Sequence, residues 1–128
     1  ICDVSVGGDW IKRIDGDGKE TGAWTPAHSL ATAPGEGFVQ PVRPRNRGNF
    51  DDTLDIEFDG PVARWLDPVP PTVAVAAGKA GWVGLRARVP GDTPPGTYTL
   101  LVRVRSRTFP AVRAEWRGSY SVVRGSAD

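Results

Sequence analysis

Proline and glycine interrupt this chain so often that no segment is left for a long helix. The 128 residues include 16 Gly and 12 Pro, which stand between short apolar runs throughout the sequence. No stretch of about eleven residues keeps apolar positions at helical spacing without such an interruption. Proline removes a backbone donor and glycine favours turns, so this distribution predicts many short strands joined by turns.

Strict alternation of apolar and polar residues marks the strands between these turns. Segment 53–60 reads TLDIEFDG, and the same two-residue period recurs in 82–89 and 96–106. Successive side chains of a strand point to opposite faces, so each segment is expected to bury one face. Short strands with turns about every 8 to 12 residues are typical of a β-sandwich. Further strands are expected over 2–6, 34–45, 62–66, 72–77 and 111–123.

The fold predicted from this pattern is all-β. We expect a single domain over residues 1–128, built as an antiparallel β-sandwich of about seven to nine strands. The prolines within 34–45 lack a donor N–H, which favours an edge position or an irregular stretch for that strand. Gly118 is predicted to form a bulge that shifts the register within the long last strand, 111–123.

Residues 8–27 are predicted to form an inserted hairpin near the N-terminus. Trp10 stands before the sequence DGDG and Trp24 follows it, and an Asp-Gly pair favours a hairpin turn. An exposed pair of tryptophans would stack on sugar rings or anchor a protein neighbour, because each supplies a large rigid contact area. The alternative, which is favoured here, is that they close a small core beneath the hairpin. The other tryptophans, Trp65, Trp82 and Trp116, are expected to pack inside the sandwich.

Five short motifs follow one another as APGE at 33–36, NRGNFDDT at 46–53, Trp65, VAVAAGK at 73–79 and VPGDTPPGTYTL at 89–100. In this order the chain resembles the Ig-like modules of large secreted and surface proteins of bacteria and archaea, which are related to domains appended to secreted α-galactosidases. The resemblance covers about residues 29–106 and the first strand. It implies an Ig-like sandwich in the extracellular space or at the cell surface. This fold hosts adhesins, linkers and sugar-binding accessories alike, so function has to come from the site.

Within this resemblance, Tyr98 occupies the place of the tyrosine corner, in which the phenol bonds a backbone group at the bend before the penultimate strand. In Ig topology that strand lies beside 53–59. Arg103 and Arg105 are therefore expected to face the acidic side chains of 53–59, at about 0.2–1 kcal/mol for each pair. These acidic side chains are Asp55, Glu57 and Asp59.

Side chains suited to catalysis are scarce. His28 is the single histidine, and the surrounding TPAHSL offers no recognisable nucleophile or acidic partner. Asp51 and Asp52 form a carboxylate pair, but their place in a turn favours hydrogen bonds to the backbone. No catalytic residue and no cofactor are predicted, and the chain is not expected to be an enzyme.

Metal and thiol chemistry are weakly indicated. The segment DGDGKE offers Asp15, Asp17 and Glu20 as oxygen ligands for calcium, but it lacks the further ligands of a calcium-binding loop. A hairpin turn with glycines at positive φ is favoured instead. Cys2 is the only cysteine, which excludes an internal disulfide and a thiolate zinc site. It is expected to be a small buried residue of the first strand, with an intermolecular disulfide as the alternative.

Charge is distributed unevenly along the chain. Residues 1–60 hold 6 Lys and Arg against 11 Asp and Glu, whereas residues 61–128 hold 10 against 4. A basic half can bind nucleic acid, but these arginines alternate along strands rather than cluster, so no nucleic-acid partner is predicted. No run of eighteen apolar residues occurs, so no membrane span is expected.

Two functions remain compatible with this sequence. In the first, the chain is a structural subunit of an extracellular, pilus-like filament, a homopolymer joined head to tail by strand addition. In the second, it is a non-catalytic module of a larger secreted enzyme or adhesin that binds carbohydrate through Trp10 and Trp24. The residues expected to carry the assembly are those of the N-terminal strand, Ile1, Cys2, Val4 and Val6.

Overall fold

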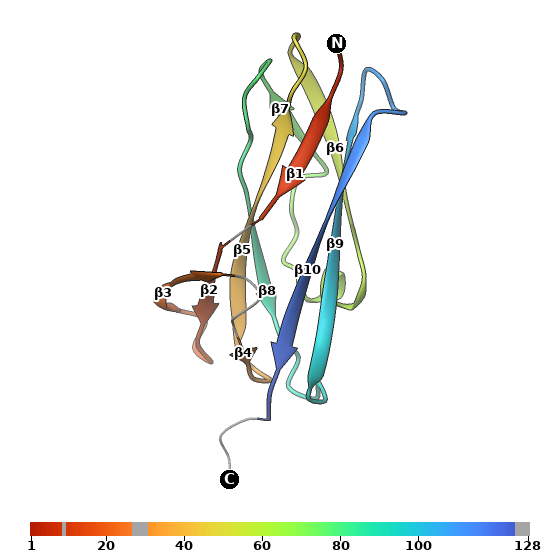
Figure 1. Ribbon diagram of the computed structural model, residues 1–128. Coiled ribbons are helices and arrows are strands. Elements are labelled where there is room, and N and C mark those ends of the chain that lie inside the picture. Colours follow the sequence, from red (N-terminus) through yellow and green to blue (C-terminus); the bar gives the residue numbers. More distant parts are fainter. Residues whose placement is uncertain (9, 27–30, 125–128) are drawn as a thin grey trace.

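Two β-sheets packed face to face make up the fold (Figure 1). The computed structural model describes residues 1–8, 10–26 and 31–124, which contain ten strands, one short 3₁₀ helix and no α-helix. The first sheet contains β1 (Val4–Gly7), β2 (Trp10–Ile14), β3 (Glu20–Pro26), β5 (Gly37–Asn46) and β8 (Val83–Arg88). The second contains β4 (Ala31–Thr32), β6 (Asp52–Asp59), β7 (Thr72–Val75), β9 (Gly96–Ser106) and β10 (Arg113–Val122).

The all-β sandwich predicted from the sequence is confirmed. The ten described strands exceed the seven to nine predicted, and the two-residue strand β4 was not among those expected. β1 and β2 pair one after the other with the same edge of β5, with Val6 opposite Pro44 and Lys12 opposite Val39. β8 pairs with the other edge, so β5 is the central strand of the first sheet.

The predicted hairpin forms, but it belongs to the first sheet instead of standing apart from it. β2 and β3 pair antiparallel across a turn in which the Asp15 carboxylate accepts hydrogen bonds from the Asp17 and Lys19 amides at 2.9 and 3.0 Å. Gly18 has a φ of 84°, which the predicted turn requires. Because β2 also pairs with β5, the hairpin widens the sheet by one strand, β3.

The predicted edge position of the proline-containing strand is wrong, since β5 is paired on both sides. Its prolines lie where no backbone donor is needed. Pro41 lies beside Gly8, between the ends of β1 and β2, and the Pro44 carbonyl accepts from the Gly81 amide at 2.7 Å, just before β8 begins. A residue of an antiparallel sheet points its N–H and C=O to the same side, so both missing donors face interruptions of neighbouring strands.

The second sheet runs in the order β4-β10-β9-β6-β7. β6, β9 and β10 pair antiparallel, with Ile56 opposite Val104 and Trp116 opposite Val102. The expectation of antiparallel pairing alone is wrong at one place, because β4 pairs parallel with the last residues of β10. Alternation along the sequence cannot reveal a strand of two residues.

Gly118 forms no bulge, contrary to the prediction. The register between β9 and β10 is continuous, so Trp116, Gly118 and Tyr120 share one face of β10. A Cβ atom at position 118 would lie 2.5 Å from the Tyr120 hydroxyl and 2.7 Å from the Trp116 ring. Glycine is required there because two large aromatic side chains meet over its backbone.

The strand predicted for 62–66 is instead a 3₁₀ helix, η2 (Pro61–Trp65). Gly60 turns the chain with a φ of 88°, and Pro61 then takes the first helical position, where its missing N–H costs no hydrogen bond. Val62 is buried, and the apolar spacing that suggested a strand reflects this short helical turn packing on the core.

The inward-facing residues predicted for the regular strands form the core, and Phe38 stacks on Tyr120 with ring centroids 4.3 Å apart. Trp65 and Trp116 are half-buried against this core, as predicted. The Tyr98 hydroxyl donates to the Pro94 carbonyl at 2.7 Å, which confirms the tyrosine corner. The fully buried apolar residues of β6, β8 and β9 include Leu54, Leu85, Leu100, Val102 and Val104.

The acidic and basic halves of the chain meet on the outer face of the second sheet. Glu57 lies opposite Arg103 in the register of β6 and β9, as expected from the alternation. The predicted cross-strand pairing is therefore confirmed. The ion pairs are Arg103–Asp59, Arg103–Glu115, Arg105–Asp55 and Arg107–Asp55, at 3.4, 2.9, 3.9 and 2.8 Å.

Candidate functional site

An open pocket lined by three tryptophan side chains lies on the first sheet, and we refer to it as the tryptophan pocket. Its volume is about 510 Å³, within the range of ligand-binding sites. Trp10, Trp24 and Trp82 stay exposed in it, with exposed fractions of 54%, 44% and 62%. Gathered apolar surface of this kind marks binding sites in soluble proteins, so the pocket is the candidate functional site. The remaining lining residues are Gly8, Pro41 and Arg43.

Three separate elements supply the tryptophans. Trp10 begins β2, Trp24 lies on β3, and Trp82 directly precedes β8. β5 lies between the hairpin and β8, and its Pro41 is opposite Gly84. A Cβ atom at position 84 would come within 2.9 Å of the Trp82 ring, so the indole lies directly over the glycine backbone. The missing side chain lets the ring rest against the sheet beside β5.

A buried polar network fixes the floor of the tryptophan pocket. Gln40 is fully buried, and its Nε2 donates to the carbonyl oxygens of Trp10 and Pro41 at 3.4 and 2.9 Å. Its Oε1 accepts from the Tyr120 hydroxyl at 2.8 Å. Burial raises the pKa of Tyr120, so the phenol keeps its proton and remains a donor. One amide therefore ties two pocket residues to the core.

Positive charge accompanies the aromatic side chains. Lys12 Nζ lies 5.8 Å from the centre of the Trp24 ring, within reach of a cation–π contact. Arg43 lines the pocket and is exposed. Among the described residues, no carboxylate lies within ion-pair distance of either cation. The pocket is thus apolar at its centre and positively charged at its side.

The two tryptophans singled out in the sequence, Trp10 and Trp24, lie together in this pocket. The favoured interpretation, a small core beneath the hairpin, is wrong for both, because each indole is exposed. The sequence pattern also places Trp82 in the interior, and this too is wrong. The sequence WVG did indicate an exposed position for Trp82. Gly84 shares a face with Trp82, and its missing side chain leaves room for the indole on the outer surface.

The residues expected to carry assembly lie within the chain's own fold. β1 begins at Val4, which is buried, and Val6 is half-buried opposite β5. The carbonyl oxygen of Ile1 accepts a hydrogen bond from the Asn49 amide at 3.2 Å. Cys2 carries a free thiol, is half-buried and precedes β1, whereas the sequence pattern placed it buried within the first strand. The N-terminal segment is therefore held by β5 and the loop that follows it.

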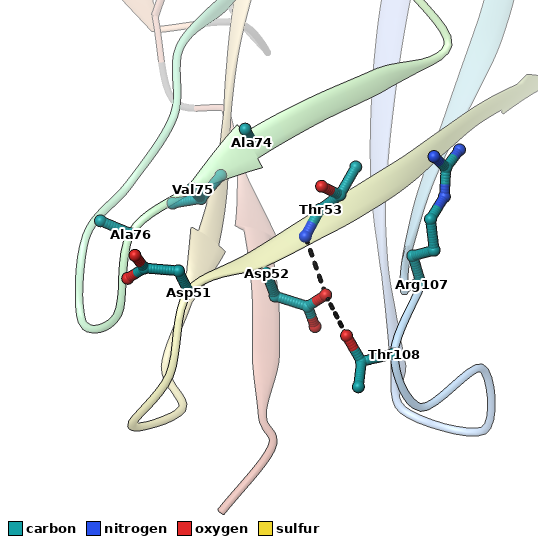
Figure 2. Close-up of a pocket in the computed structure, with 8 residues that line it drawn as sticks. All are labelled: Asp51, Asp52, Thr53, Ala74, Val75, Ala76, Arg107 and Thr108. Atoms are coloured by element: carbon teal, nitrogen blue, oxygen red, sulfur yellow. Dashed lines mark hydrogen bonds between the residues drawn. The ribbon is translucent and has the colours of Figure 1, made fainter.

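A second hollow, of about 380 Å³, lies where β6 begins (Figure 2). Figure 2 shows the Asp52 carboxylate reaching to Thr108, with hydrogen bonds of 2.8 Å from the Thr53 amide and from the Thr108 hydroxyl. The Ser106 hydroxyl also donates to Asp52. Burial acts to raise the pKa of Asp52, but these hydrogen bonds outweigh it and hold the pKa below its usual value.

The carboxylates of this hollow hold the fold together. Asp51 accepts a hydrogen bond from the Ala77 amide at 2.9 Å, which ties β6 to the turn after β7. Asp52 ties the first residue of β6 to the end of β9 and the loop after it. The predicted bonding of Asp51 and Asp52 to the backbone is therefore confirmed. Both side chains are occupied by internal donors.

The sequence also offered a histidine and the acidic residues of the hairpin turn as candidates for catalysis or metal binding. His28 lies outside the described residues. Asp15 accepts hydrogen bonds within its turn, and Glu20 lies 3.8 Å from Arg86. No group of three or more His, Cys, Asp or Glu is arranged to hold a metal ion within 1–8, 10–26 and 31–124. In the same part of the chain, no helix has the length and apolar character needed to cross a membrane.

Similarity to known proteins is found at the level of structure and not of sequence. No family model matches the sequence, and a search of curated proteins finds no match. A family 123 glycoside hydrolase from Clostridium perfringens, studied for glycolipid glycan hydrolysis, has a TM-score of 0.60 at 10% identity, over 98% of this chain and 28% of that one. The ASH/PapD-like domain 7 of human CEP192 has a TM-score of 0.52 at 15% identity, over 77% and 80%. The YadV chaperone has a TM-score of 0.50 at 12% identity, over 98% and 53%.

These similarities concern the fold. The chain spans about half of the chaperone and little more than a quarter of the hydrolase. At such identities the shared architecture does not carry an activity across. The closer resemblance to modules appended to secreted α-galactosidases stays a prediction. The chain is a β-sandwich of the Ig-like, PapD-like kind.

Proposed function

We propose that the chain is a non-catalytic β-sandwich module of an extracellular or cell-surface protein, and that it binds a polysaccharide in the tryptophan pocket. The observation that carries the proposal is the gathering of three exposed indoles from three elements at one pocket. The apolar faces of sugar rings pack on flat aromatic rings, and tryptophan offers the largest such area. The indoles line an open surface, which suits one or two units of a longer sugar chain.

The chemistry of the pocket favours binding over catalysis. Its described lining residues include no carboxylate, histidine, serine or cysteine, and glycoside hydrolysis ordinarily needs two carboxyl groups. Arg43 is the one charged side chain of that lining. The match of this sandwich covers 28% of the length of an enzyme studied for glycolipid glycan hydrolysis. Such partial coverage is consistent with an accessory role beside a catalytic domain.

Replacing Trp10 and Trp24 together with alanine is expected to weaken polysaccharide binding by at least about 100-fold. Each truncation removes an aromatic contact of about 2 kcal/mol with a sugar ring. Because both indoles are exposed, the fold is expected to be kept. Affinity electrophoresis in gels containing polysaccharide measures the binding, and circular dichroism measures the fold.

A matched control is available for this experiment. Phe109→Ala removes an aromatic side chain of similar exposure, 51%, from a loop outside the tryptophan pocket. This variant should migrate through the gels as the wild type does. The proposal is contradicted if a folded Trp10→Ala, Trp24→Ala protein is retained as strongly as the wild type.

A second candidate function is that of a subunit of a pilus-like filament, joined head to tail by strand addition. It is supported by the free edge of β10. β9 pairs with one edge of β10, and on the other edge β4 pairs only with Ser121 and Val122. From Arg113 to Tyr120 no strand of the described chain pairs with that edge. An unpaired edge is a template for a strand from another copy.

In this candidate, the N-terminal segment of one copy leaves β5 and pairs with β10 of the next copy. The pairing of β1 within one molecule is then exchanged for the same kind of pairing between molecules, as in a domain swap. Cys2, Val4 and Val6 alternate with Asp3 and Ser5 along this segment, which suits insertion along an open sheet edge. The residues involved are Ile1, Cys2, Val4 and Val6.

Two variants test the filament. Deleting residues 1–6 is expected to convert long polymers of the full-length protein into monomers, as seen by negative-stain electron microscopy and size-exclusion chromatography.

The deletion also removes Val4, which belongs to the core, so Arg117→Pro is a second variant that blocks strand addition without shortening the chain. The Val123 amide donates to β4, so by alternation the N–H of Arg117 faces the free edge, and proline removes that donor. The Trp10→Ala, Trp24→Ala protein should still polymerise. A full-length protein that stays monomeric at high concentration contradicts this candidate.

A further inference from the structure

We propose that the sugar chain bound in the tryptophan pocket is acidic, and that Arg43 binds its anionic group. This inference rests on the proposed polysaccharide binding and names the class of sugar. Its starting point is the place of Arg43 in the pocket lining, beside three exposed indoles. The Arg43 side chain is exposed, and no carboxylate of the described chain lies within ion-pair distance of it.

Several other arginines of the sandwich are neutralised by the chain itself. Those of β9 on the second sheet pair with acidic side chains of β6 and β10. On the first sheet, Arg13 lies 3.0 Å from Glu36 and Arg86 lies 3.8 Å from Glu20. Arg43 has no such ion pair among the described residues, and neither have Arg45, Arg113 and Arg117, but of these only Arg43 lines the tryptophan pocket. Within the part of the chain that the structure describes, no carboxylate neutralises this cation, so complementary charge on a ligand would suit it.

Further positive charge lies close to Arg43. Arg45 follows two residues later on β5, so both side chains point to the same outer face of the first sheet. Lys12 lies over the ring of Trp24, which is itself a lining residue of the pocket. Neither cation has an ion-pair partner among the described carboxylates. The electrostatic potential of these cations therefore favours an anion at the pocket.

The combination of side chains matches a sugar that carries an acidic group. A guanidinium binds a carboxylate or a sulfate through parallel hydrogen bonds, and the indoles beside it stack on the sugar ring. Single-stranded nucleic acid also presents rings and negative charge. Its binding sites, however, follow the backbone over about 4 to 16 nucleotides with a cationic groove. A pocket of about 510 Å³ with one charged lining residue, in a chain of net charge +1, fits an acidic sugar better.

Matched polymers that differ in charge test the inference. Polygalacturonate and hyaluronate carry free carboxylates, and their methyl esters keep the same sugars without the charge; dextran sulfate and dextran form the corresponding pair for sulfate. Isothermal titration calorimetry is expected to show about tenfold tighter binding of one acidic class than of its neutral partner. Arg43→Gln should equalise the affinities for the acidic and the neutral form. Arg117→Gln, which removes the same charge from β10, should keep the preference.

The outcomes separate this inference from the proposed function. Equal binding of acidic and neutral polymers, or a preference that survives Arg43→Gln, overturns the role of Arg43 and leaves tryptophan-dependent binding standing. Absence of binding to all six polymers overturns the proposed function itself. A preference for carboxylates or for sulfate that Arg43→Gln abolishes supports the inference and identifies the anion. Tighter binding of an oligo-dT strand than of every polysaccharide overturns the sugar as ligand.

Discussion

Replacing Gln40 with alanine is expected to lower the free energy of unfolding by about 3 kcal/mol. Gln40 is fully buried, and its amide bonds the Tyr120 hydroxyl and the carbonyl oxygens of Trp10 and Pro41. Truncation leaves these polar groups without their partner, and each unsatisfied buried group costs about 1–3 kcal/mol. The variant should also bind polysaccharide more weakly, because the backbone of two pocket residues loses its anchor.

Urea denaturation followed by circular dichroism measures this effect. Tyr120→Phe removes only the donor hydroxyl and is expected to cost about 1 kcal/mol. The double variant should be less destabilised than the sum of the single variants, with a coupling energy of about 1–2 kcal/mol. Ser119→Ala, at an exposed position of β10, is the control and should stay within about 0.5 kcal/mol of the wild type. An unchanged urea midpoint for Gln40→Ala would refute the role of the network.

Asp52→Ala is expected to destabilise the fold by about 3 kcal/mol as well. Its carboxylate accepts hydrogen bonds from the Ser106 and Thr108 hydroxyls and from the Thr53 amide. Hydrogen bonds to charged groups contribute about 1.5–3 kcal/mol each, and removal of the carboxylate leaves the buried Ser106 hydroxyl without its acceptor. Asp51→Ala is the matched control. Asp51 is exposed and makes one bond to the Ala77 amide, so its loss should cost less than about 1 kcal/mol.

The Asp52 carboxylate also makes the free energy of unfolding depend on pH in the acidic range. Burial acts to raise the pKa of Asp52, but hydrogen bonds from Ser106 and Thr108 outweigh it and place the pKa below the usual 3.8. A carboxyl group with a lowered pKa in the folded state contributes stability above pH 3.8, and this contribution is lost as the pH falls through the folded-state pKa. Asp52→Asn should therefore flatten the pH dependence of the unfolding free energy below about pH 4. A slope equal to that of the wild type would disprove this account.

The regular strands of the sandwich were predictable residue by residue. β6, β8 and β9 bury the apolar side chains that alternation marks, such as Leu54, Leu85 and Leu100. Local geometry decides this, because every second side chain of a strand shares a face. The tyrosine corner at Tyr98 and the pairing of Arg103 with Asp59 followed once the order of the strands came from the Ig-like resemblance.

Pairing partners were not predictable in the same way. The prolines of β5 favoured an edge, and β5 is central because its neighbours are interrupted beside Pro41 and Pro44. Gly118 suggested a bulge, and it serves instead as the space over which Trp116 and Tyr120 meet. For β5 the deciding contacts involve atoms of neighbouring strands, which leave no periodic trace in β5 itself. For Gly118 they come from two large side chains of the same strand, β10, whose conformations depend on packing against the rest of the core.

For the tryptophan pocket, the sequence by itself determined that Trp10 and Trp24 flank a hairpin turn. Only the tertiary structure decided that both indoles are exposed, that Trp82 joins them across β5, and that Arg43 lies beside them without an internal partner. The physical reason is that alternation decides which side chains of one strand share a face. The pairing of strands far apart in the sequence decides which faces come to lie side by side.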